Sequence, residues 1–253
     1  MASRTWTAWT LWCLGYPNQA LQQTLESLAL AQGVAHPYSL AHALLVTTRL
    51  HQLRREVQTI LERSETAINL ATEREYPLIV AGVTMYRGWA LAMQGQGAEG
   101  VAQIQEGLAS WRALGTEGVR PYFLALLAEA YGTMRQVDPG LHALAEALEV
   151  VSKTGERWVE AELYRTQGDL LLRQSPADER QAETCFHQAL AVARRQQAKS
   201  WELRAATSLA RLWQHQGKRA EARDLLAPIF NWFSEGFDTF DLRCAKALLE
   251  ELS

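Results

Sequence analysis

The chain has 253 residues and a formal net charge of −3, and 48% of its residues are hydrophobic. This charge argues against a general nucleic-acid surface, because binding to phosphates needs a basic face, and no apolar run approaches the length of a membrane span. Three scattered cysteines support neither a disulfide framework nor a zinc site, and the N-terminus lacks the pattern of a secretory signal. We expect a cytoplasmic protein.

The sequence resembles itself with a period of about 40 residues, and such periods are typical of repeat architectures. The eighth position of successive units holds Ala8, Thr48, Gly88, Ala128, Gly168 and Ala210, and the twentieth holds Ala20, Ile60, Gly100, Gly140, Ala182 and Ala222. Small side chains at these positions suit the contact points of closely crossing helices, and the second unit departs most from this pattern. The period predicts one repeat domain over residues 1–253, with units of approximately 1–36, 37–76, 77–118, 119–156, 157–198 and 199–235.

Each unit is predicted to contain two helices, A and B, because its apolar residues follow helical spacing. The first helix carries Trp6, Trp9 and Trp12, whose spacing of three keeps them near one another. Helix A of the second, third and fourth units starts with a proline, where the missing N–H costs nothing; these residues are Pro37, Pro77 and Pro121. After the sixth unit, an apolar stripe predicts a capping helix over residues 238–252.

The residues Gly95, Gly97 and Gly100 match the glycine fingerprint of dinucleotide-binding loops. That fingerprint works only where it follows a buried strand and opens a helix, and the apolar stretch before Gly95 is too long for one strand. Gly217 occupies the equivalent place in the sixth unit. We therefore interpret Gly95 as the end of a helix and Gly100 as a small contact residue between two helices.

No arrangement typical of catalysis or metal binding stands out in the sequence. The six histidines form no H-E-x-x-H motif, and no serine lies in a G-x-S-x-G elbow. Cys185 lies near His187, but neighbouring residues of a helix point apart, which argues against a nucleophilic pair. The chain is predicted not to be an enzyme and to need no cofactor or metal.

At the repeat positions that hold small or bulky residues, the sequence resembles the tetratricopeptide repeat (TPR) superfamily. Residues 163–196 carry the clearest match, with Gly168, Ala182, Phe186 and Ala189 in register. The long units also look like the C-terminal repeat regions of bacterial ATPase/adenylate-cyclase or LuxR-type signalling proteins. The resemblance implies an all-α, right-handed superhelical solenoid of about six antiparallel helix pairs with a C-terminal capping helix.

The same resemblance implies an inner groove lined by positions 2, 5, 9, 12 and 13 of each helix A. Carried over, these positions predict an apolar early part, with Trp9, Trp12, Arg49, Met85, Trp89 and Met93. They also predict a charged late part, with Glu129, Glu162, Arg165, Asp169, Arg173, Arg204, Arg211 and His215. The alternative is that the polar side chains of helix A are simply solvated.

The function predicted from these features is that of a non-catalytic scaffold, which binds a protein or peptide segment in the groove and serves a larger bacterial signalling regulator as its sensor or recruiting module. The alternative is a repeat domain that senses a small-molecule effector and regulates an attached NTPase, cyclase or transcriptional output. Neither nucleic acid nor a membrane is expected as a partner. Trp6, Trp9 and Trp12 pack internally, or they contact an upstream domain or a second copy.

The register can be tested at Gly168. Leucine there should be severely destabilising, because it would overpack a helix crossing. Alanine should be mild or stabilising, because it would gain helix propensity.

Overall fold

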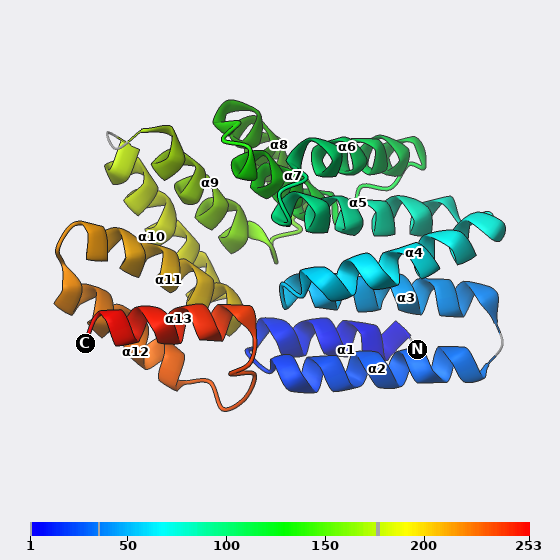
Figure 1. Ribbon diagram of the computed structural model, residues 1–253, viewed down its shortest axis with the longest axis horizontal. Coiled ribbons are helices and arrows are strands. Elements are labelled where there is room, and N and C mark those ends of the chain that lie inside the picture. The colour runs from blue at the N-terminus through cyan, green and yellow to red at the C-terminus, as the bar shows by residue number, and fades with distance from the viewer. Residues whose placement is uncertain (1, 35, 176–177) are drawn as a thin grey trace.

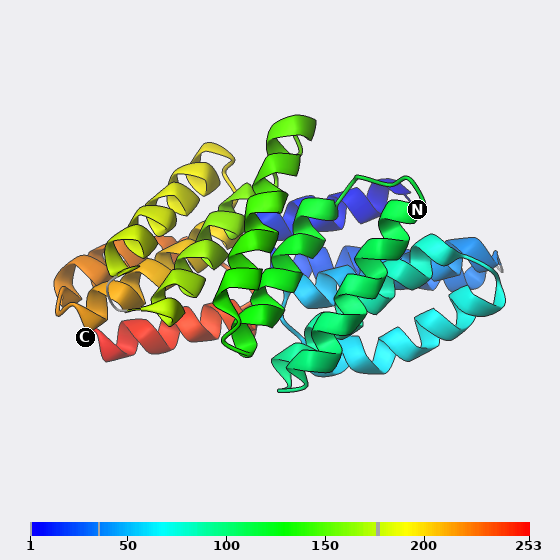
Figure 2. The ribbon, with the colours of Figure 1, turned by 90° about the horizontal axis from the view of Figure 1, so that it is seen from above.

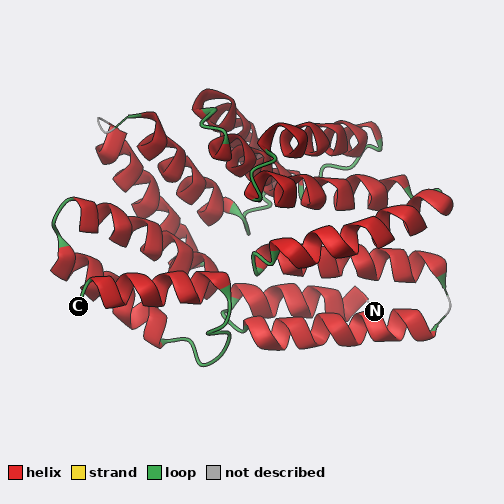
Figure 3. Cartoon of the chain, viewed as in Figure 1, coloured by secondary structure: helices red, strands yellow, loops and turns green. Residues whose placement is uncertain are grey.

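The computed structural model describes residues 2–34, 36–175 and 178–253. Within these ranges the chain is all-α, with thirteen helices and no strand (Figures 1 and 3). The helices are α1 (Ala2–Cys13), α2 (Pro17–Gly33), α3 (Pro37–Leu53), α4 (Val57–Glu73), α5 (Pro77–Met93), α6 (Gly97–Ala113), α7 (Arg120–Thr133), α8 (Val137–Thr154), α9 (Glu160–Gln174), α10 (Glu179–Arg195), α11 (Lys199–His215), α12 (Arg219–Asn231) and α13 (Phe240–Glu251). Among the described helices, none is long and apolar enough to cross a membrane.

The first twelve helices form six consecutive pairs, and α13 packs against α11 and α12 at the C-terminal end. Leu242, Ala245 and Leu248 form the buried stripe of α13. The predicted all-α solenoid of helix pairs with a capping helix is therefore confirmed.

Short turns that contain one residue with positive φ separate many of the helices. Gly15, Gly95 and Gly217 have φ values of 92°, 91° and 78°, whereas Arg55 and Arg135 adopt similar angles without being glycine. A residue in this left-handed region ends a helix and lets the following helix fold back antiparallel. Gly95 thus ends α5, a helix and not a strand, so the three glycines do not form a dinucleotide-binding loop.

The small residues of the repeat lie where the two helices of a unit cross. A Cβ atom added to Gly100 in α6 would lie 2.4 Å from the carbonyl oxygen of Gly88 in α5. At Gly168 in α9, an added Cβ would lie 2.5 Å from the ring of Phe186, which is fully buried. The structure argues against the expectation that alanine is mild or stabilising at position 168, because its methyl group would overlap a fully buried ring.

The last unit folds back onto the first, so that residues far apart in sequence touch (Figures 1 and 2). The Ser200 hydroxyl donates to the carbonyl oxygen of Trp12 at 2.5 Å, and Glu235 accepts from the backbone N–H of Asn18 at 2.9 Å and of Gln19 at 3.0 Å. The Arg204 guanidinium donates to the carbonyl oxygen of Leu53 at 2.6 Å. We call this set of contacts the end-to-end contact.

Two glycines leave room for this approach. A Cβ atom at Gly15 would lie 2.6 Å from the ring of Trp232, and one at Gly236 would lie 2.2 Å from Cγ of Pro17. Both glycines also have positive φ, so a side chain at either position would be strained and crowded. The backbone of each end is thus shaped to fit the other.

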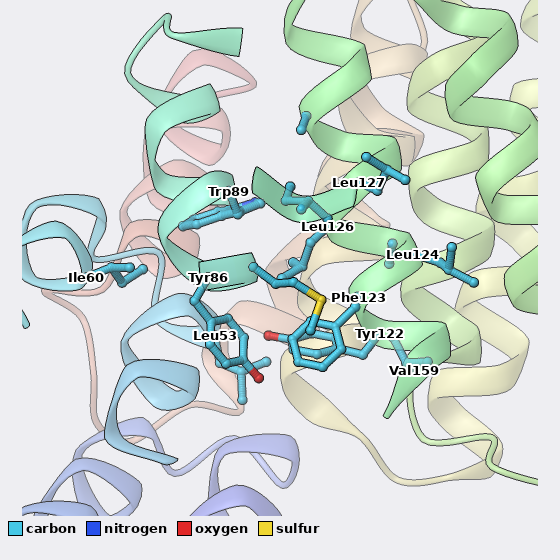
Figure 4. Packing of buried hydrophobic residues seen from close by; sticks show 14 of the residues in the cluster. Leu53, Ile60, Tyr86, Trp89, Tyr122, Phe123, Leu124, Leu126, Leu127 and Val159 are labelled. Atoms are coloured by element: carbon cyan, nitrogen blue, oxygen red, sulfur yellow. The ribbon is translucent and has the colours of Figure 1, made fainter. Parts of the chain in front are cut away.

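The core of the middle units lies between α3, α5 and α7. Tyr86 and Tyr122 are fully buried or nearly so, and Phe123 packs on Tyr86 with ring centroids 5.3 Å apart. Figure 4 shows these rings gathered beside Leu53, with Trp89 one turn further along α5. Aromatic side chains from successive units therefore pack together on the inside of the solenoid.

Candidate binding pocket inside the ring of first helices

The first helices of the six units form a closed ring. Each one contacts the next in the order α1, α3, α5, α7, α9, α11, and α11 contacts α1. All fourteen residues predicted to line a groove lie on these six helices. Because the ring is closed, the inner faces of the six helices meet around a common centre. Some of the fourteen side chains are therefore buried, and others remain accessible.

Tryptophans fill the centre of the ring near α1. Trp9 meets Trp158, which precedes α9, with ring centroids 4.1 Å apart, and Trp12 meets Trp201 of α11 at 4.6 Å. Trp12 is only 2% exposed, so it cannot line a groove as predicted. Of the three tryptophans in α1, only Trp6 presents a largely exposed ring, at 59%. Contacts made by the closed ring therefore account for Trp9 and Trp12.

Met85 and Trp89 of α5 are both fully buried, so the predicted apolar groove does not exist at these residues either. The indole N–H of Trp89 donates to one oxygen of Glu129 at 2.7 Å, and Arg55 donates to the other oxygen at 2.5 Å. Burial by itself raises the pKa of Glu129, but the charges of Arg55 and Arg165 and these two hydrogen bonds outweigh it and lower that pKa to about 2. Glu129 is thus a fixed carboxylate that joins the second, third and fourth units.

The remaining two early residues, Arg49 and Met93, are half-buried. Arg49 donates to the hydroxyl of Tyr86 at 2.8 Å, and its guanidinium lies 5.2 Å from the ring centre of Trp9. Met93 places its sulfur 3.9 Å from Arg55. Both side chains are held by neighbours inside the ring and do not project from it as a free surface.

The late residues form a network of buried ion pairs. Arg165 donates to both oxygens of Glu162 at 2.7 and 2.8 Å and also pairs with Asp169. Arg204 donates to Glu162 at 3.1 Å and to Asp241 of α13 at 2.8 Å. Burial would raise the pKa of Glu162, but the charges of Arg165 and Arg204 lower it. The network therefore connects α9, α11 and α13 through charges that all have partners.

A pocket of about 200 Å³ lies beside this network. It is lined by Arg55, Glu129, Arg165, Asp169, Arg173, Arg204, Thr207, Ser208, Arg211, Phe240, Asp241 and Cys244. Five arginines and three carboxylates line it, and Glu162 behind it is a fourth carboxylate that pairs with Arg165 and Arg204, so the excess is one positive charge. Because these residues come from the second, fourth, fifth and sixth units and from α13, the pocket exists only while the ring is closed.

Six of the predicted late residues line this pocket, whereas Glu162 lies buried behind it and His215 lies outside it on an exposed part of α11. Sequence reasoning missed Arg55, Ser208 and Asp241, among others. Arg55 lies in the turn after α3, and Asp241 lies on the capping helix, so neither occupies an inner position of a helix A. The repeat pattern contains no signal for such residues, because only the folding back of the chain brings them to the site.

The pocket holds no arrangement that could bind a metal through several protein ligands. Among the described residues, no group of three or more His, Cys, Asp or Glu side chains could hold a metal ion. What the pocket does contain is guanidinium and hydroxyl donors, which suit the recognition of an anionic oxygen group.

No protein-family model matches the sequence. Residues of this chain are 26% identical over 166 positions to an uncharacterized protein of Rhizobium meliloti (strain 1021), a match that covers 66% of this chain and 16% of that protein. The chain therefore spans only about a sixth of that relative's length.

Solved structures are similar over almost the whole chain. A Signal Transduction ATPase with Numerous Domains (STAND) protein with a tetratricopeptide repeat sensor, from Pyrococcus horikoshii, matches 98% of this chain and 37% of its own at a TM-score of 0.54 and 13% identity. The chain has a TPR fold. BtubC (BKLC) from P. vanneervenii has a TM-score of 0.57 with 15% identity over 93% of this TPR solenoid and 89% of its own chain. The apo form of RapI has a TM-score of 0.59 with 13% identity over 97% and 80%.

Proposed function

We propose that this TPR solenoid is a non-catalytic binding module, and that it holds a protein or peptide segment at the pocket inside the ring. The observation that carries the proposal is that Arg173 and Arg211 line the pocket without an ion-pair partner among the described residues, beside a network whose own charges are all paired. Such a site is ordered before its ligand arrives, so binding does not carry the entropic cost of ordering its side chains. An acidic segment of a partner is the ligand that this charge favours.

We further propose that the module serves as the sensor or recruiting part of a larger cytoplasmic signalling regulator of a bacterium. Two comparisons support this role: the relative from R. meliloti is much longer than this chain, and the P. horikoshii protein is a STAND protein whose TPR region is called a sensor. In such an arrangement the solenoid would bind its partner while an attached domain produces the output.

A second candidate is the sensing of a small effector. The pocket, of about 200 Å³, is smaller than the ~300–1,000 Å³ of usual sites for drug-sized ligands, so any effector bound there would be small. A pocket of this size accepts a single charged group, either on a side chain of a partner or on a small molecule.

Binding of dye-labelled acidic and basic dodecapeptides, followed by fluorescence polarisation, tests the proposal. Acidic peptides should bind the wild-type chain, and the double variant Arg173→Gln/Arg211→Gln should bind them more than tenfold more weakly. Arg223→Gln is the matched control, since Arg223 is exposed on α12, outside the pocket. If acidic peptides bind the double variant as tightly as the wild type, or do not bind at all, the pocket is not a peptide site.

A further inference from the structure

We infer that the ligand group recognised in this pocket is a phosphate monoester, an inference that rests on the proposed binding function and names its chemistry. All three carboxylates of the pocket are already engaged. Glu129 is bound by Arg55 and Trp89, Asp169 by Arg165, and Asp241 by Arg204. The charge that remains free for a ligand is therefore entirely positive.

Two arginines carry this free charge. Arg173, in the last turn of α9, and Arg211, on α11, both line the pocket, and among the described residues neither has an ion pair or a side-chain hydrogen bond. Arg173 is placed against Gly132 of α7, where an added Cβ would lie 2.8 Å from its Nη1 atom. The absence of a side chain at Gly132 thus makes room for the guanidinium.

A third donor lies next to Arg211 on the same helix. Ser208 is only 9% exposed and lines the pocket, and its hydroxyl has no hydrogen-bond partner among the described residues. This oxygen is not among the fully buried polar atoms without a partner, so it is accessible and can donate to a ligand. Two guanidinium groups and one hydroxyl therefore border the same small space.

A phosphate monoester fits these donors better than a carboxylate does. It carries about −1.5 to −2 charges at pH 7 and has three terminal oxygens, which suit two guanidinium groups without ion-pair partners and one hydroxyl. A carboxylate carries one charge and would leave one guanidinium uncompensated. The volume of about 200 Å³ holds roughly six or seven water-sized groups at ~30 Å³ each, enough for a phosphoryl group and its ester oxygen. Two sources present this group: a phosphorylated side chain of the partner and a free small molecule.

The inference predicts a pH dependence that comes from the ligand. The groups facing the phosphate are Arg55, Arg165, Arg173, Arg204, Arg211, Glu129, Asp169, Asp241 and the thiol of Cys244. The arginines stay charged, and Glu129, with a pKa of about 2, is ionised throughout the range from pH 5 to pH 7. The second ionisation of a phosphate monoester lies near pH 6. If the dianion is the bound form, affinity should therefore rise about tenfold between pH 5 and pH 7.

The probes are N-acetyl-phosphoserine methylamide, its aspartate counterpart, inorganic phosphate, and one serine peptide in phosphorylated and unphosphorylated form. Isothermal titration calorimetry measures each affinity, and the NMR signals of the arginine Nε–H groups report whether Arg173 and Arg211 are engaged. We expect the phosphoserine compound to bind at least tenfold more tightly than the aspartate compound. Arg173→Gln and Arg211→Gln should each weaken its binding about tenfold, and Ser208→Ala should weaken it less, whereas Arg223→Gln should have no effect.

The two sources of phosphate give different results. Tighter binding of the phosphopeptide than of the phosphoserine compound supports a phosphorylated partner, and equal binding supports a small effector. The inference is overturned if the aspartate compound binds as tightly as the phosphoserine compound, or if Arg223→Gln weakens binding as much as Arg211→Gln does. If the wild type nevertheless binds unphosphorylated acidic peptides and the double variant does not, the proposed function is still supported, although the recognition of phosphate is not.

Discussion

The end-to-end contact depends on Arg204, so replacing this residue should open the ring. Arg204 is 6% exposed and donates three hydrogen bonds, to Glu162, Asp241 and the carbonyl oxygen of Leu53. Its guanidinium also lies 5.1 Å from the ring centre of Trp12. Arg204→Met retains an apolar stem of similar reach but removes the charge and all donors.

The expected cost follows from what the substitution leaves behind. Asp241 loses its ion-pair partner, and Leu53 retains a buried carbonyl group without this donor, whereas Glu162 is still bound by Arg165. Breaking a buried ion pair typically costs ~3–5 kcal/mol, and we expect a loss in this range. Arg211→Met is the matched control, because Arg211 lies on the same helix two turns later but is exposed. Its effect should remain within ~0.5 kcal/mol.

Urea denaturation followed by circular dichroism measures both free energies of unfolding. Hydrogen exchange should become faster at the end of α3 and in α13 of the Arg204 variant, and small-angle scattering should show a larger radius of gyration. If the two variants differ by less than about 0.5 kcal/mol and the radius is unchanged, Arg204 does not hold the ends together, and the reasoning about the closed ring is wrong.

Three further predictions concern stability. Gly168→Ala should destabilise the chain by up to about 2 kcal/mol, because overpacking against Phe186 costs ~1–3 kcal/mol and the gain in helix propensity is only ~1 kcal/mol; a urea midpoint at or above that of the wild type would contradict this. The pKa of Glu129 is lowered from 4.5 to about 2, so its charged form adds about 3 kcal/mol of stability above pH 4.5, which is lost as the pH falls towards 2. In the Glu129→Gln variant, the free energy of unfolding should therefore depend less on pH between pH 2 and pH 7. Identical pH profiles for the variant and the wild type would refute the lowered pKa of Glu129. Glu235→Ala removes the acceptor of two N–H groups at the start of α2 and should cost ~1 kcal/mol; hydrogen exchange should speed up at Asn18 and Gln19, and unchanged exchange there would argue against the contact.

Much of the fold could be predicted from local patterns. Helical spacing of apolar residues indicates helices, and prolines at helix starts, such as Pro37 and Pro77, mark where they begin. The small residues of the repeat mark where helices cross, as Gly88 and Gly100 do. These signals are local because each unit contacts mainly its neighbours, so a unit's own sequence largely determines its shape.

The site could be predicted only in part. The inner positions of helix A select Arg173 and Arg211, and both line one pocket, because the direction of a side chain follows from the helix period. The same positions also selected Trp12 and Trp89, which are buried. A helix position determines which way a side chain points, but it does not determine what lies opposite.

The closed ring follows from the tertiary packing of all six units. Each unit is turned slightly relative to the one before it, and the small turns add up along the chain. Whether the rotations between six units bring α11 against α1 depends on the packing at every helix crossing, which no single stretch of sequence encodes. The accumulated rotation packs Trp9 against Trp158 and Trp12 against Trp201, and it brings Arg55 and Asp241 to the pocket. Local sequence patterns specify the helices and their repeat, whereas closure of the ring specifies which of their inner residues became core and which became a site.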